Sequence, residues 1–147
     1  MKAILRAVLV AVVALGICQA ATAAGAAAAA ADSKKLESTP QVKAYRAQLA
    51  AMKAGDYEAY KKTMVKEAGP QMDKQAKEMG KSPKEVLGFM VMMTPADITI
   101  TSMKVEGKKA TLTASGKLDG ELNKGTIEMA EEDGQWKVGH QSWSNAK

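Results

Sequence analysis

Apolar residues recur at helical spacing after residue 38. Val42, Tyr45, Leu49 and Met52 form the clearest stripe, and intervals of three or four residues place such side chains on one face of a helix. Ser38-Thr39-Pro40 before the stripe supplies a capping hydroxyl and a proline at the first helical position, where its missing N–H costs nothing. With Gly55 as the C-terminal stop, the pattern predicts a helix beginning at Pro40.

Three shorter helices are predicted to follow. Asp56 caps the second, which carries apolar side chains at Tyr57, Tyr60 and Met64 and is predicted to end at Gly69-Pro70. A weaker third segment spans residues 71–79. The capping box Ser82-Pro83-Lys84-Glu85 then begins a short and nearly all-apolar helix, residues 86–93, which ends before Pro95.

After Pro95 the apolar period changes from 3.6 to 2. Four segments rich in Thr, Ile and Val are predicted strands: 98–105, 110–118, 125–130 and 135–143. Short connections that contain glycine make consecutive strands pair antiparallel, although the one from Asp119-Gly120 to Lys124 is looser. Helices followed by an antiparallel meander indicate an α+β fold in which the helices cover one face of the sheet.

The phase of the strands assigns their faces. Leu112 and its alternating neighbours lie on one face, while Thr111, Thr113 and Ser115 lie on the other. On the last strand, the same alternation places His140 on the face of Trp136. The first strand loses its phase near Ser102, which predicts a β-bulge there.

The N-terminus has the pattern of an export signal. Lys2 and Arg6 precede an uncharged apolar run of eleven residues, 7–17, which is too short for a permanent span. We predict a signal peptide over 1–23, cleaved after Ala23, although cuts after Ala20 or as late as Ala31 also satisfy the small-residue rule. A lipid anchor on Cys18 is the weaker alternative, because Ile17 stands where a small residue is expected.

Export changes the composition of the mature chain. Removal of the signal peptide leaves no cysteine, and leaves 19 basic against 16 acidic residues, a net charge of +3. Because the lysines are dispersed among acids, nucleic-acid binding is not expected. We predict a periplasmic or secreted protein without a transmembrane span after processing. An alanine-rich leader, 24–37, precedes one domain, 38–147.

Two segments resemble small exported members of the nuclear transport factor 2-like superfamily. One is Met52-Lys53-Ala54-Gly55-Asp56-Tyr57 between the first two helices. The other is Glu131-Glu132-Asp133-Gly134-Gln135-Trp136-Lys137-Val138 at the last strand. The resemblance implies a cone, in which a curved four-stranded antiparallel meander wraps helices packed in its concave face and leaves a pocket at its open end. Members include isomerases, dehydratases and non-catalytic binding modules, often dimeric through the outer sheet face, and fold alone does not choose among them.

The candidate pocket residues are few. Tyr45, Tyr60, Met90, Trp136 and His140 are predicted to line a pocket, although tyrosines on a helix stripe are more often core residues. A lone histidine without an orienting carboxylate is a weak catalytic signal. We therefore expect a non-catalytic envelope module that binds a small apolar ligand, a peptide or another envelope protein, and that forms a homodimer through the outer sheet face if it follows its relatives.

Two alternatives stay open at this point. The first is an isomerase or dehydratase that uses His140 with a tyrosine, since a histidine titrates near neutral pH. The second is a copper(I) site at Met90, Met92 and Met93. Methionine also stands where leucine would on the helix stripes, which favours a general core role, so no cofactor, metal ion or catalytic residue is assigned.

Overall fold

The computed structural model describes residues 32–146. The signal peptide predicted over 1–23, its cleavage site, Cys18 and the leader up to residue 31 lie outside the described residues. The last part of the predicted leader, residues 32–37, is helical. It is joined to the sheet by the Ser33 hydroxyl, which donates to the Ile100 carbonyl at 3.2 Å, so the folded domain extends back to Asp32.

Helix α2 (Pro40–Ala54) has both predicted ends. The Thr39 hydroxyl accepts a hydrogen bond from the Val42 N–H at 3.4 Å, and Pro40 occupies the first turn. Gly55 ends the helix with φ of 68°, a left-handed conformation that glycine adopts without strain. These signals are local in sequence, which is why the pattern located the helix correctly.

The next helices differ from the prediction at one point. Helix α3 (Tyr57–Lys62) is capped by Asp56, whose carboxylate accepts from the Ala59 N–H at 2.9 Å. It ends seven residues before Gly69-Pro70, and that pair lies in the first turn of α4 (Ala68–Glu78) instead of ending α3. Proline is as well tolerated in a first helical turn as after a helix, so the prediction of Gly69-Pro70 as a stop was wrong.

Helix α5 (Pro83–Met92) begins with the predicted capping box. The Ser82 N–H donates to the Glu85 carboxylate at 2.7 Å, and the Glu85 N–H donates to the Ser82 hydroxyl at 3.4 Å. The helix buries Val86 and Leu87, while its C-terminal half is largely exposed. An apolar helix that is only half buried leaves apolar surface for other contacts.

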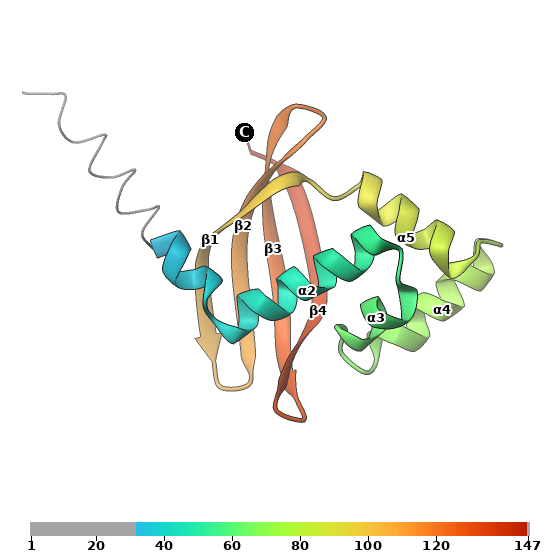
Figure 1. Cartoon of the computed structure of the whole chain (residues 1–147), viewed down its shortest axis with the longest axis horizontal. Coiled ribbons are helices and arrows are strands. Elements are labelled where there is room, and N and C mark those ends of the chain that lie inside the picture. Colours follow the sequence, from blue (N-terminus) through green and yellow to red (C-terminus); the bar gives the residue numbers. More distant parts are fainter. Residues whose placement is uncertain (1–31, 147) are drawn as a thin grey trace, which may run out of the picture.

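The four strands form one open antiparallel meander in sequence order. They are β1 (Ala96–Glu106), β2 (Lys109–Leu118), β3 (Glu121–Glu132) and β4 (Gln135–Asn145). The predicted bulge in β1 is confirmed by a register shift between Ile100 and Ser102. Figure 1 shows α2 across the curved sheet and α3, α4 and α5 beyond the β4 edge. The predicted α+β fold is confirmed.

Two details of the sheet were predicted incorrectly. Asp119 and Gly120 form a tight turn with φ of 53° and 84°, and β3 begins directly afterwards, so the expected loose connection to Lys124 does not exist. In β4, Val138 pairs with Met129 but His140 pairs with Glu128, because a register shift leaves Gly139 unpaired. The predicted alternation of Trp136, Val138 and His140 therefore fails at this bulge.

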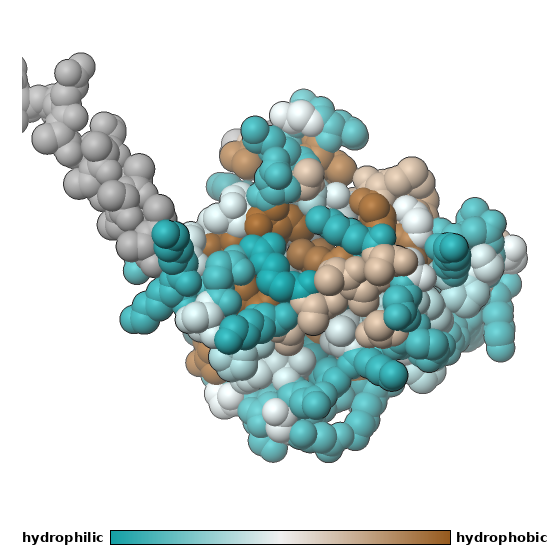
Figure 2. Space-filling model, in the orientation of Figure 1, coloured by the Kyte–Doolittle hydropathy of each residue, from teal (hydrophilic) through white to brown (hydrophobic). Residues whose placement is uncertain are grey.

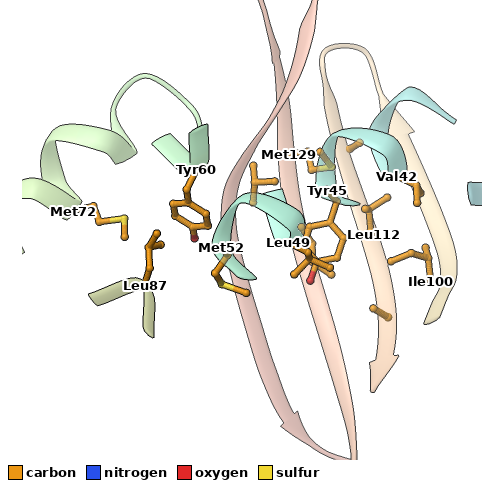
Figure 3. Close-up of a cluster of buried hydrophobic side chains, with 14 of the residues drawn as sticks. Val42, Tyr45, Leu49, Met52, Tyr60, Met72, Leu87, Ile100, Leu112 and Met129 are labelled. Atoms are coloured by element: carbon orange, nitrogen blue, oxygen red, sulfur yellow. The ribbon is translucent and has the colours of Figure 1, made fainter. Parts of the chain in front are cut away.

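The core has two connected parts (Figure 3). Over the sheet, Val42 and Tyr45 of α2 lie beside Leu112 and Ile100. Among the helices, Tyr60 of α3, Met72 of α4 and Leu87 of α5 form a second group, with Met52 at the α2 end between the two groups. Helix α2 thus joins the sheet to the helices beyond the β4 edge.

Within residues 32–146, no helix is both long and apolar enough to cross a membrane.

Candidate functional site

The space between α2 and the sheet is filled where the pocket was expected. Tyr45 is 0% exposed and Tyr60 is 2% exposed, and both belong to the hydrophobic core. The Tyr45 hydroxyl donates to the Gln141 side chain at 3.4 Å. Burial raises the pKa of Tyr60 to about 12 and raises that of Tyr45 further. The two tyrosines are the core residues that a helix stripe usually indicates, and neither offers surface to a ligand.

A hollow of about 440 Å³ lies between α4, α5 and β4. We call it the methionine groove. Most of its lining is apolar and comes from the helices and from Met64, which follows α3, while Gly139 and His140 come from β4. Its lining residues are Met64, Ala68, Gln71, Met72, Gln75, Met79, Val86, Phe89, Met90, Gly139 and His140.

Large apolar side chains at the groove are unusually exposed. Phe89 is 56% exposed and Met79 is 50% exposed, and Met92 and Met93 at the end of α5 are more than half exposed as well. Figure 2 shows apolar atoms over the end of α5 that lies nearest the sheet, and hydrophilic atoms at the far tip of the α4 and α5 pair. Contiguous apolar surface of this kind marks binding sites in soluble proteins.

A polar cluster fixes α4 against α3 beside the groove. The Tyr57 hydroxyl and the Lys61 ammonium donate to opposite oxygens of the Asp73 carboxylate, at 2.6 and 2.8 Å. These donors lower the pKa of Asp73, and burial together with the Asp73 carboxylate raises the pKa of Tyr57. The cluster thereby holds in place the part of α4 that carries Met72 and Gln75, two residues that line the groove.

A larger hollow of about 500 Å³ lies between the end of α3, the start of α4 and the turn from β3 to β4, and three of the four lysines that line it are already engaged. Lys61 pairs with Asp73 at 2.8 Å, and Lys66 pairs with Asp133 at 2.7 Å. The Lys137 ammonium donates to the Lys62 carbonyl. Because these cations contact groups of the chain itself, this hollow is a weaker candidate for binding than the methionine groove.

The predicted site residues are therefore separated. Met90 and His140 both line the methionine groove, whereas Trp136 lies at a different hollow of about 420 Å³ beside Ala44 and Lys62. His140 is exposed, opposite Glu128 in the register. Met64, Met79 and Phe89 were not predicted as site residues. The signal that could have found Phe89 is the apolar composition of α5 on all sides, more than one short helix can bury.

The outer face of the sheet carries hydroxyl side chains in register. Thr113 pairs with Ser102 on one side and with Thr126 on the other, and Thr126 pairs with Ser142. All four of these residues are exposed. In the part of the chain that the structure describes, no run of residues covers this face.

Among residues 32–146, no three His, Cys, Asp or Glu side chains gather as metal ligands would.

Comparison with known proteins gives one structural likeness. The chain is similar to a solved NTF-2-like protein of unknown function from Silicibacter pomeroyi DSS-3, with 15% sequence identity and a TM-score of 0.45 over 85% of this chain and 99% of that one. No family model matches the sequence, and no curated protein matches it.

Proposed function

We propose that this protein is an exported, non-catalytic binding module of the bacterial envelope that holds an apolar segment of a partner protein in the methionine groove. The observation that carries the proposal is the groove itself, about 440 Å³ of mostly apolar lining with Phe89 half exposed at its side. Covering apolar surface stabilises a complex by about 25 cal/mol per Å² before the costs of association are subtracted. The groove therefore takes the place of the cone interior as the proposed binding site.

The character of the lining favours binding of a variable apolar partner. Four methionines, Met64, Met72, Met79 and Met90, contribute to it. Methionine has an unbranched and polarisable side chain that repacks around different shapes, which suits surfaces that accept more than one sequence. His140 is the one titratable group among the described residues that line the groove, and general acid–base chemistry usually needs a second, orienting group.

The proposal is tested by the binding of a neutral apolar dye. Phenylnaphthylamine fluoresces strongly only in apolar surroundings, so we expect enhanced emission with the mature protein. Phe89→Glu introduces a charge at the groove and is expected to weaken binding about tenfold, the equivalent of about 1.4 kcal/mol.

Val105→Glu is the matched control. Val105 is 45% exposed on β1 and is not among the groove residues, so the same substitution there adds the same charge elsewhere on the surface. It should leave the dye affinity unchanged. Equal loss of affinity in both variants, or no dye binding by the parent protein, would refute the methionine groove as a binding site.

A further inference from the structure

Strand β4 pairs with β3 along one side, and its outer side is paired at one position only within the described residues. It is last in the sheet order. On its outer side, the Val138 N–H donates to the Thr63 carbonyl at 2.8 Å, and the Val138 carbonyl accepts from the Val65 N–H at 3.0 Å. This bridge runs parallel to β4. Beyond it, residues 139–145 have no neighbouring strand on that side in the part of the chain described.

The free part of the edge adjoins the methionine groove. Met64, the centre of the bridge, lines the groove, and so do Gly139 and His140, the next two residues of β4. Helices α4 and α5 form the other side (Figure 1). A chain that entered the groove along β4 would therefore meet unpaired backbone groups on one side and methionine side chains on the other.

We propose that the occupant of the groove is an extended segment of the partner protein, which adds a strand to β4 and continues the pairing that Thr63 and Val65 begin. The inference rests on the proposed function and specifies the form of its ligand. Strand addition supplies affinity through main-chain hydrogen bonds, and the pocket beside the edge selects side chains at alternate positions. The segment presents apolar side chains to the methionines and polar ones to solvent, with a period of two.

Charge adds a second property of the partner. Between Lys61 and Met93 the chain has seven lysines and four acidic residues, whereas the sheet has more acidic than basic residues. Helices α4 and α5 each carry as many acidic as basic residues, so this positive excess comes from the residues around them, with Lys61, Lys62 and Lys66 before α4 and Lys81 between the two helices. An extended segment with acidic residues at its ends complements this charge.

The arrangement disfavours two other occupants. A helix has a diameter of roughly 10 Å and satisfies its own backbone, so it would leave the β4 edge unpaired. A second copy of this chain would have to bring its own β4 edge alongside, but α4 and α5 stand beyond that edge (Figure 1). A single extended chain would lie about 4.8 Å from β4, the usual distance between paired strands. It would continue along the edge from the point where the bridge at Met64 ends.

The test uses a labelled peptide of alternating leucine and threonine with two aspartates at each end, titrated into the mature protein and followed by fluorescence anisotropy. Two derivatives carry backbone N-methyl groups, one on the leucine set and one on the threonine set. In an added strand only one set of amides faces β4, so one derivative is expected to lose roughly tenfold or more in affinity while the other retains it. Lysines in place of the aspartates should weaken binding.

Amide hydrogen exchange reports the same contact from the protein side. Peptide binding is expected to slow the exchange of backbone amides within residues 139–145, and Phe89→Glu should abolish both the binding and the protection while Val105→Glu retains them.

Equal affinity of both methylated derivatives without protection of β4 would overturn strand addition but would not contradict binding in the methionine groove. Failure of both the peptide and the dye would remove the proposed function as well. A β4-paired dimer that the peptide dissociates would identify a second copy as the occupant and overturn the inference.

Discussion

At the scale of single residues, the sheet depends on a close approach between Gly125 of β3 and Trp143 of β4. A Cβ atom at Gly125 would lie 2.6 Å from the indole ring, far inside ordinary contact distance. We expect Gly125→Ala to lower the free energy of unfolding by about 1 to 3 kcal/mol, because the ring must shift within a packed face of the sheet. Urea denaturation followed by far-ultraviolet circular dichroism measures the change.

Gly88 provides the control with the opposite sign. It lies inside α5, and a Cβ there would meet nothing within 4 Å. Gly88→Ala should raise the free energy of unfolding by about 0.5 to 1 kcal/mol, since glycine loses more backbone entropy in a helix than alanine does. Stabilisation by Gly125→Ala would show that the indole is free to move and that the approach does not constrain the fold.

His140 illustrates what the pattern of residues could not predict. Its alternation with Val138 placed it on the inner face, but the bulge at Gly139 puts it opposite Glu128. An equivalent bulge in β1 was predictable, because Ile98 and Ile100 fall out of phase with Met103 and Val105. On β4 the apolar residues before and after the bulge are too few to show a change of phase.

At the scale of elements, Arg46 fastens the N-terminal helical residues 32–37 and α2 to the sheet. Its guanidinium donates to the Ile98 carbonyl at 2.9 Å and to both oxygens of the Glu37 carboxylate. The hydrogen bonds from Arg46 lower the pKa of Glu37 below its ordinary 4.5. The pair therefore stabilises the folded state most when Glu37 is ionised.

The Arg46–Glu37 pair stabilises the folded chain more at neutral than at acidic pH. The pKa of Glu37 is lower in the folded than in the unfolded chain, so the contribution is complete above about pH 5 and is lost as pH falls through the folded pKa. We expect Glu37→Gln to remove up to about 1 kcal/mol at pH 7, the usual ceiling for a solvent-screened pair, and less at pH 3. Urea denaturation across this pH range measures both values.

A double-mutant cycle separates the pair from the other contact of Arg46. Arg46→Gln should cost more than Glu37→Gln, because it also removes the hydrogen bond to Ile98. In the Arg46→Gln background, Glu37→Gln should have little further effect. A pH dependence that persists in that double variant would mean that other carboxylates cause it.

Element boundaries were predictable where the deciding chemistry is local. The Thr39 cap, the Gly55 stop and the Ser82 capping box each involve residues within a few positions of one another, and each is present in the structure. The prediction that Gly69-Pro70 ends a helix was wrong because the same dipeptide suits both the end of one helix and the start of the next. The choice was made by tertiary pairing, since the residues after α3 hydrogen-bond to Val138 and interrupt the helix there.

At the scale of the whole molecule, the architecture followed from the order of periods along the chain, but the position of the groove did not. Sequence phase indicates which residues are apolar, and not which of them remain uncovered after the core is filled. Tyr45 and Leu49 fill the space over the sheet, whereas Phe89 and Met79 are left at the surface. That outcome depends on where α4 and α5 lie beyond β4, which no local pattern specifies.

The mature chain is expected to begin after Ala23. If residues 1–23 are removed on export, the intact mass of protein purified from the envelope corresponds to a chain that begins after Ala23 and lacks cysteine. Cys18→Ser should leave both this mass and the amount of exported protein unchanged, because Cys18 leaves with the signal. A lipid anchor would instead make export and membrane retention depend on Cys18 and would add the mass of the lipid to the mature chain.

A cut as late as Ala31 would keep every described residue, including the helical residues that begin at Asp32 and contact the sheet through Ser33. A cut after Asp32 would remove the start of that helix, and one after Ser33 would also break the contact with Ile100. The contact between Ser33 and Ile100 therefore sets the latest cut that leaves the described fold complete, and a chain cut anywhere from Ala23 to Ala31 keeps every residue that lines the methionine groove.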